Sequence, residues 1–245
     1  MVHYEKEQSV ALITFQRSDF EAYSGLQRVS ELNCVRDRVC QDADIRVIVI
    51  GGTEIFSDGS EAESASLPDY KDSIASIVGG FENITIASVS GESFGLGLEM
   101  ALTCDLRLCA ETACFSMDHI AYGIMPSNGG TQRLSRVIGQ AKAMEMILTG
   151  ELIDAQEAYR IGLVTKVVSP KELMPATMEM AREMASKGPI ALRYAKEAVY
   201  KGMDLTLEQG LRLEADLYFL LHTTKHRTEG IRAFQEKRPP RFEGR

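Results

Sequence analysis

The segment Ser93–Asp105 carries the residues best suited to acid–base chemistry. It reads SFGLGLEMALTCD, so that a single carboxylate, Glu99, stands in an apolar run that ends at Asp105. Gly95 and Gly97 leave the backbone bare where the pattern predicts the beginning of a helix. The first N–H groups of a helix lack intrahelical partners and lie at the positive end of the helix dipole, so they can bind an anion or an oxyanion. Glu99 would lie on the same helix face one turn further, as a candidate proton carrier.

Two other interpretations of this segment stay open. Glu99 could be structural, as the acidic half of a buried ion pair with an arginine. The glycines could belong to a dinucleotide-binding loop, but G-x-G-x-x-G fits poorly because Met100 stands where the third glycine belongs.

A second candidate is His119, in the segment FSMDHIAYGIMPSNGGTQRL. The other histidines are His3 near the N-terminus and His222 and His226 on or beside a charged helix. Histidine can act as an acid or a base near neutral pH, although a lone histidine is also often a structural group. The part SNGGTQR lacks the G-K-[ST] of a phosphate-binding loop, and it predicts a turn followed by the N-terminus of a helix.

A third candidate is the turn Gly51–Glu63, which reads GGTEIFSDGSEAE. It follows the apolar run Ile45–Ile50, and Gly59 would expose bare backbone near the end of that predicted strand. This turn is therefore either a ligand contact or an ordinary polar surface loop.

Strand and helix patterns alternate in the first part of the chain and must position these groups. Val2–Lys6 and Val10–Phe15 predict an antiparallel pair of strands, and Ser24–Gln41 has apolar residues at helical spacing. Strands buried on both faces are predicted from three apolar, largely β-branched runs, for which we expect parallel pairing with right-handed crossovers: Ile45–Ile50, Ile84–Val89 and Leu106–Cys109. After Pro170 every periodic segment is helical.

The composition limits the classes of function. The chain has 245 residues, 44% of them hydrophobic, and a formal net charge of −8, which argues against a nucleic-acid or anionic-membrane partner. We expect neither a signal peptide nor a membrane span. The five cysteines match no zinc pattern, and they predict reduced, mostly buried thiols in a cytoplasmic protein.

Four segments in this order resemble the crotonase superfamily, the enoyl-CoA hydratases and isomerases, over nearly the whole chain. IRVIVIGGTEIFSDGSE is similar to a strand followed by F-S-x-G-A-D, and SVSGESFGLGLEMALTCD is similar to A-V-N-G-x-x-x-G-G-G-x-E-L-A-x-x-C-D. YGIMPSNGGTQRL resembles L-G-x-x-P-G-x-G-G-T-Q-R-L, and FQEKRPPRF resembles F-x-E-K-R-x-P-x-F. The resemblance implies an α/β fold, a crotonase-like spiral of ββα units with a helical C-terminal region. It also implies a core at residues 1–187, a trimerisation region at 188–245, and a homotrimer or a dimer of trimers.

The resemblance also implies a site that binds an acyl-CoA thioester. Its oxyanion hole would consist of the N–H groups of Ser60 and Leu96, and its two catalytic positions fall on Glu99 and His119. No metal is implied, and coenzyme A enters only as part of the substrate. The remaining substrate-binding positions fall on Ala22, Ser57, Asp58, Gly59, Glu61, Gly95, Gly97, Tyr122, Gly123, Pro126, Phe234 and Lys237.

The sequence departs from the family pattern at informative positions. His119 stands where hydratases have a second glutamate, and Leu96 replaces the middle glycine of the oxyanion segment. Ser127 occupies the position where dienoyl-CoA isomerases and a dehalogenase subgroup have aspartate, so those reactions are disfavoured. The basic segment Lys237–Arg241 could contact the CoA phosphates of a neighbouring subunit or be a solvated tail.

The leading hypothesis is therefore an acyl-CoA lyase that adds water to an enoyl-CoA, or removes it, through Glu99 and His119. Because His119 replaces the second glutamate, an isomerase, a thioester hydrolase or a decarboxylase is an alternative. A catalytically inactive binder of acyl-CoA or of an acyl carrier is a third hypothesis.

Overall fold

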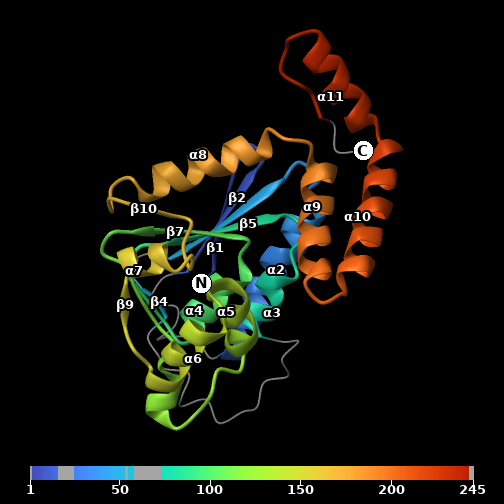
Figure 1. Cartoon of the computed structure of the whole chain (residues 1–245). Coiled ribbons are helices and arrows are strands. Elements are labelled where there is room, and N and C mark those ends of the chain that lie inside the picture. The colour runs from blue at the N-terminus through green and yellow to red at the C-terminus, as the bar shows by residue number, and fades with distance from the viewer. Residues whose placement is uncertain (1, 16–24, 53–54, 58–72, 243–245) are drawn as a thin grey trace.

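The computed structural model describes residues 2–15, 25–52, 55–57 and 73–242 (Figure 1). Its larger sheet has six strands in the order β1-β2-β3-β5-β7-β10. β1 pairs with β2 in antiparallel register, as the sequence predicted, and every other neighbouring pair in this sheet is parallel. The strands are β1 (His3–Glu7), β2 (Val10–Phe15), β3 (Val47–Gly52), β5 (Ile84–Val89), β7 (Leu106–Ala110) and β10 (Lys166–Val168).

A smaller sheet has the order β4-β6-β8-β9, with strands β4 (Ile55–Ser57), β6 (Glu92–Phe94), β8 (Cys114–Ser116) and β9 (Ile153–Asp154). Three consecutive strand pairs are divided between the two sheets: in β3/β4, β5/β6 and β7/β8 the first strand belongs to the larger sheet and the second to the smaller one. A helical segment follows each pair: α3 (Ile74–Gly79), α4 (Leu96–Thr103), and the 3₁₀ helix η3 (Asp118–Tyr122), after which comes α5 (Gly130–Ile138). These three repeats confirm the predicted spiral of ββα units.

Two apolar layers bury the faces of the larger sheet, which explains its β-branched strands. One layer includes side chains of α2, α3 and α4, and the other is formed by α8, which lies across β3, β5 and β7 (Figure 1). The remaining helices are α2 (Gly25–Gln41), α6 (Gln140–Thr149), α7 (Ala155–Arg160), α8 (Leu173–Ala185), α9 (Pro189–Gly202), α10 (Leu207–His222) and α11 (Lys225–Gln235). In the described part of the chain, no helix has both the length and the apolar character that crossing a membrane requires.

Of the last three helices, α9 contacts β5 and packs against α10, and α10 and α11 extend away from the sheets (Figure 1). Lys196 attaches α9 to the core, because its Nζ lies 3.0 Å from Oδ2 of Asp105 and donates to the carbonyls of Phe81 and Asn83. Burial, with the neighbouring Asp105, raises the pKa of Tyr200 on the same helix to about 12. These partly buried polar contacts fix the position of α9 on the spiral.

The segment after α11 folds back on that helix. Both terminal nitrogens of Arg238 donate to Glu229, at 2.6 and 3.0 Å, and the backbone N–H of Arg241 donates to the same carboxylate. Arg238 and Arg241 thereby lower the pKa of Glu229 to about 2. The Arg238 side chain of the basic segment is therefore engaged within its own chain.

The cysteines only partly match the prediction of buried thiols. Cys104 and Cys109 are buried, and desolvation raises the pKa of each thiol to about 12. Cys34 and Cys40 are exposed on α2, so the prediction was wrong for these two. Their neighbours Leu32, Val35 and Val39 form the buried face of α2, and the helical period turns Cys34 and Cys40 outward.

Candidate active site

Glu99 lies in the first turn of α4, within the core. Gly95 caps this helix with φ 48° and ψ −120°, a conformation that glycine adopts far more readily than other residues. All eight residues of α4 are buried, and Glu99 itself is 0% exposed. A carboxylate in this environment is tolerated only if hydrogen-bond donors compensate for the loss of water.

Those donors come from the loop that precedes α5. Oε1 of Glu99 accepts the backbone N–H groups of Asn128 and Gly130, both at 2.8 Å. Oε2 accepts the side-chain amide of Asn128 at 3.3 Å. The alternative of an arginine partner was wrong: in the described chain, the hydrogen bonds to this carboxylate come from main-chain and amide donors.

The loop can approach the carboxylate because residue 130 has no side chain. A Cβ at Gly130 would lie 2.9 Å from Oε1 of Glu99 and 3.0 Å from Cβ of Pro126. Gly130 is also the first residue of α5, so the positive end of that helix dipole faces the acid. Arg133 donates to the carbonyl of Asn128 at 2.7 Å and anchors the loop from its other side.

His119 lies beside Glu99, at the second of the two positions that the sequence singled out. Its Nε2 is 3.4 Å from Oε2 of Glu99, and its side chain is 9% exposed. This separation is longer than a usual N–H···O hydrogen bond. Nδ1 of His119 is buried and has no hydrogen-bond partner among the described residues. The pair can exchange a proton through one nitrogen and one oxygen.

The N-terminus of α4 completes this cluster. A Cβ at Gly95 would lie 3.7 Å from Cε1 of His119 and 3.4 Å from Oδ1 of Asp118. Leu96 is the first residue of α4, so its N–H has no acceptor within the helix, while its side chain is buried. Gly97 follows and is also buried.

Of the other predicted positions, Pro126 lies at this cluster, beside Gly130. Ser57 is the last residue of β4, Gly123 ends η3 in a left-handed conformation with φ 71°, and Tyr122 is exposed. Ala22, Asp58, Gly59, Ser60 and Glu61 lie outside the described residues.

Phe234 and Lys237 are not brought to this cluster. Phe234 lies on α11 and is 85% exposed, and Lys237 follows the end of that helix. Because α11 extends away from α4 and α5 (Figure 1), these two residues cannot meet Glu99 within one chain. A role for them in substrate binding requires the site of another subunit.

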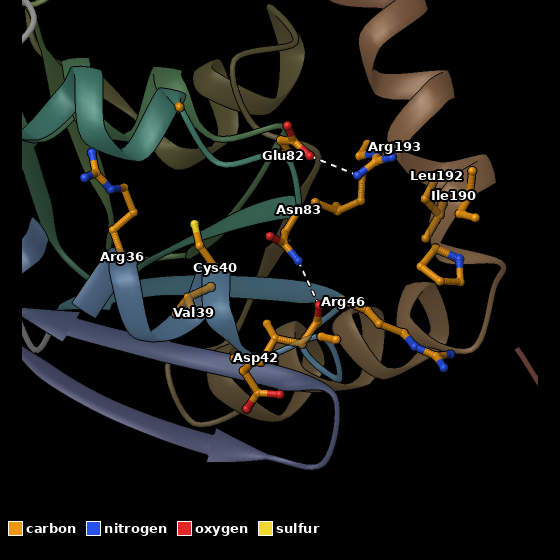
Figure 2. A pocket seen from close by; sticks show the side chains of 15 residues that line it. Arg36, Val39, Cys40, Asp42, Arg46, Glu82, Asn83, Ile190, Leu192 and Arg193 are labelled. Atoms are coloured by element: carbon orange, nitrogen blue, oxygen red, sulfur yellow. Dashed lines mark hydrogen bonds and ion pairs between the residues drawn. The ribbon is translucent and has the colours of Figure 1, made fainter. Parts of the chain in front are cut away.

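A cavity of about 670 Å³ lies at a different edge of the sheet (Figure 2). It is bounded by the end of α2, the beginnings of β3 and β5 and the N-terminus of α9. Its arginines already have partners: Arg36 pairs with Asp37, Arg193 pairs with Glu82, and Arg46 donates to two backbone carbonyls. Ligands of parallel sheets usually bind at the carboxyl ends of the strands, and this cavity is at the opposite ends.

The two residues that donate hydrogen bonds to the Glu99 carboxylate were not predicted from the sequence. Asn128 and Gly130 are 29 and 31 residues away from it, in a segment that was correctly interpreted as a turn and a helix N-terminus. The glycine pair Gly129 and Gly130 indicated that another group could approach the backbone closely at this point. Nothing in the sequence indicated that this group is the carboxylate of Glu99.

The chain folds as a spiral of ββα units, with the Glu99 carboxylate and the His119 imidazole at the N-terminus of α4. This combination defines an enzyme of the crotonase fold. A model of the family described as enoyl-CoA hydratase/isomerase matches residues 5–245. A probable enoyl-CoA hydratase of Rhizobium meliloti is 38% identical over 98% of this chain and 97% of its own length. The 2,3-dehydroadipyl-CoA hydratase of Escherichia coli is 36% identical over 98% of this chain and 97% of its own length.

The crystal structure of an enoyl-CoA hydratase from Bacillus anthracis superposes with a TM-score of 0.91 at 33% identity, over 100% of this chain and 99% of the other. The chain belongs to the enoyl-CoA hydratase/isomerase family and is an enzyme of that family.

Proposed function

We propose that the protein adds water to the double bond of an α,β-unsaturated acyl-CoA thioester, or catalyses the reverse dehydration. The observation that carries this proposal is the buried pair of Glu99 and His119, 3.4 Å apart, beside the N-terminus of α4. Membership of the enoyl-CoA hydratase/isomerase family supports the choice of substrate class.

In this proposal the thioester carbonyl oxygen accepts the N–H of Leu96 and, by resemblance, the N–H of Ser60. Two preorganised donors stabilise the enolate-like transition state, and each such donor is typically worth several kcal/mol. Glu99 takes a proton from water while the water oxygen bonds to the β-carbon, and His119 gives a proton to the α-carbon. The proton then passes from Oε2 of Glu99 to Nε2 of His119, which restores both groups.

The unmodified protein and a panel of enoyl-CoA esters of increasing chain length test this proposal. We expect the ultraviolet absorbance of the conjugated thioester to decrease with time, and mass spectrometry to detect the product 18 Da heavier, as addition of one water requires. If no ester gains water, the proposal is wrong, and if all esters bind in calorimetry and none is turned over by any reaction, the binder hypothesis is supported.

A second candidate function is another reaction on acyl-CoA, because histidine occupies the second catalytic position. The variant His119→Glu separates the two. This variant restores the pair of carboxylates that the hydratase pattern has. Under the leading proposal His119 already supplies the second acid–base group, so we expect the variant to hydrate the ester no faster than the unmodified protein. An increase of about 10²-fold or more, the lower end of the effect of one acid–base group, would show that His119 directs the site to isomerisation, hydrolysis or decarboxylation.

The assembly is part of the same proposal. We infer that residues 1–187 form the catalytic core and that residues 188–245 join subunits into a trimer or a dimer of trimers. Large apolar side chains are exposed on the helices after residue 188, among them Leu207, Phe219 and Val199 at 80%, 69% and 68%. Analytical ultracentrifugation should find three or six chains per particle, and a stable monomer would contradict this inference. A cytoplasmic location, which cell fractionation tests, completes the proposal.

A further inference from the structure

We propose that Asn128 is a positioning residue, whose side-chain amide holds Oε2 of Glu99 in place for proton exchange with His119. This inference rests on the proposed hydration reaction for its kinetic test, but the contact itself can be tested without turnover. The position of Asn128 is the unspecified x of the family pattern P-G-x-G-G-T, so the resemblance assigns no role to it.

The two oxygens of Glu99 have different environments. Oε1 accepts two backbone N–H groups at 2.8 Å, which saturate it with short bonds. Among the described residues, the polar atoms near Oε2 belong to side chains: Nδ2 of Asn128 at 3.3 Å and Nε2 of His119 at 3.4 Å. Oε2 is therefore the oxygen that can take up and release a proton, and Asn128 is the group that orients it.

The orientation of the Asn128 amide follows from its neighbours. Its Nδ2 lies between two oxygens, Oε2 of Glu99 and Oγ of Ser127 at 3.2 Å, so both of its hydrogens have acceptors. A flipped amide would put a carbonyl oxygen against a carboxylate, which is repulsive. Asn128 thus acts as a pure donor toward Glu99.

The backbone of Asn128 is fixed independently of its side chain. Its N–H is bound to Glu99, and its carbonyl accepts from Arg133 at 2.7 Å. Removing the carboxamide should therefore leave the loop and Oε1 in place and free only Oε2. This separation makes the side-chain contribution measurable.

The kinetic test compares Asn128→Ala and Asn128→Asp with the unmodified protein. Since a misplacement of about 1 Å costs about 10²-fold, we expect Asn128→Ala to lower kcat by roughly 10- to 100-fold with little change in KM. Asn128→Asp keeps the shape but brings a second carboxylate to Glu99, so at neutral pH its kcat should fall further than that of Asn128→Ala. If Asn128 served only to fill space, the isosteric Asn128→Asp would be the more active variant, and the proposal would be overturned.

The second test measures thermal unfolding against pH. In Asn128→Asp two buried carboxyl groups must share a proton, so their folded-state affinity for it rises above the unfolded value. The shared proton stabilises the folded variant at low pH, and this stabilisation is lost as the pH rises. The melting temperature of Asn128→Asp should therefore lie below that of the unmodified protein by a larger margin at pH 8 than at pH 5. The matched control is Gln132→Glu, the same amide-to-carboxylate exchange at an exposed residue of α5. Its melting temperature should differ from that of the unmodified protein by the same amount at pH 5 and pH 8.

The two tests separate the failure of this inference from the failure of the proposed function. If the unmodified protein hydrates no ester, the function is wrong, and the pH dependence of unfolding alone decides the role of Asn128. If hydration occurs while Asn128→Asp matches Gln132→Glu in unfolding and the unmodified protein in kcat, the function stands and this inference is wrong. Folding of Asn128→Asp only at the lower pH would support it.

Discussion

The Glu99→Gln variant is expected to hydrate enoyl-CoA about 10²–10⁴-fold more slowly, the range associated with one acid–base group. The amide oxygen can keep the two backbone bonds that Oε1 now accepts. The new NH₂ group then faces Nδ2 of Asn128, which is also a donor, and it cannot accept a proton from water. The measurement is kcat at saturating substrate, together with calorimetry of acyl-CoA binding, which should be retained.

Glu92→Gln provides the matched control. Glu92 lies on β6, seven residues before Glu99, and its side chain is exposed, so the same exchange should leave kcat unchanged. Turnover of Glu99→Gln within twofold of this control would remove Glu99 from the mechanism.

The Gly130→Ala variant is expected to lose stability and activity together. Its methyl group would lie 2.9 Å from Oε1 and 3.0 Å from Cγ of Glu99, and 3.0 Å from Cβ of Pro126. Because both neighbours are packed, the loop must move away and the 2.8 Å bond to Glu99 is lost. We expect the free energy of unfolding to fall by about 1–3 kcal/mol, the usual cost of overpacking, with a fall in kcat. Urea unfolding and steady-state kinetics measure the two effects.

Gly202→Ala is the comparison for this substitution. Gly202 is the last residue of α9, its φ is not positive, and a Cβ there would meet no atom within 4 Å. Alanine at such a site usually stabilises by about 0.4–1 kcal/mol, because it restricts the unfolded chain. Equal stability of the two variants would mean that residue 130 is not in close contact with Glu99.

The spiral could be predicted from the sequence because its signals are local. Ile84–Val89 and Val10–Phe15 are strands with the predicted bounds, since a short β-branched run between turn residues suits a buried strand. The start of α4 at Leu96 was likewise predicted from the glycines around it. The helices of the C-terminal part of the chain were predicted from the helical spacing of their apolar residues and from the prolines at their boundaries.

The surroundings of Glu99 could not be predicted in the same way. They depend on contacts between residues about 30 positions apart, and both an arginine partner and a catalytic role were compatible with the spacing. His119 could be placed at the site only through a resemblance, because no local pattern distinguishes a catalytic histidine from a structural one. Phe234 shows the same limit, since it lies on α11, which extends away from Glu99 within this chain.

The attachment of Oε1 to peptide N–H groups has a consequence for how this lineage can change. The backbone N–H of residue 128 is present whichever side chain this residue carries. A substitution there therefore changes the surroundings of Oε2, while Oε1 of Glu99 keeps its hydrogen bonds to the main chain. Gly130, in contrast, admits almost no replacement. New reactivity can therefore evolve at one residue of the loop without dismantling the scaffold that keeps a charge inside the protein.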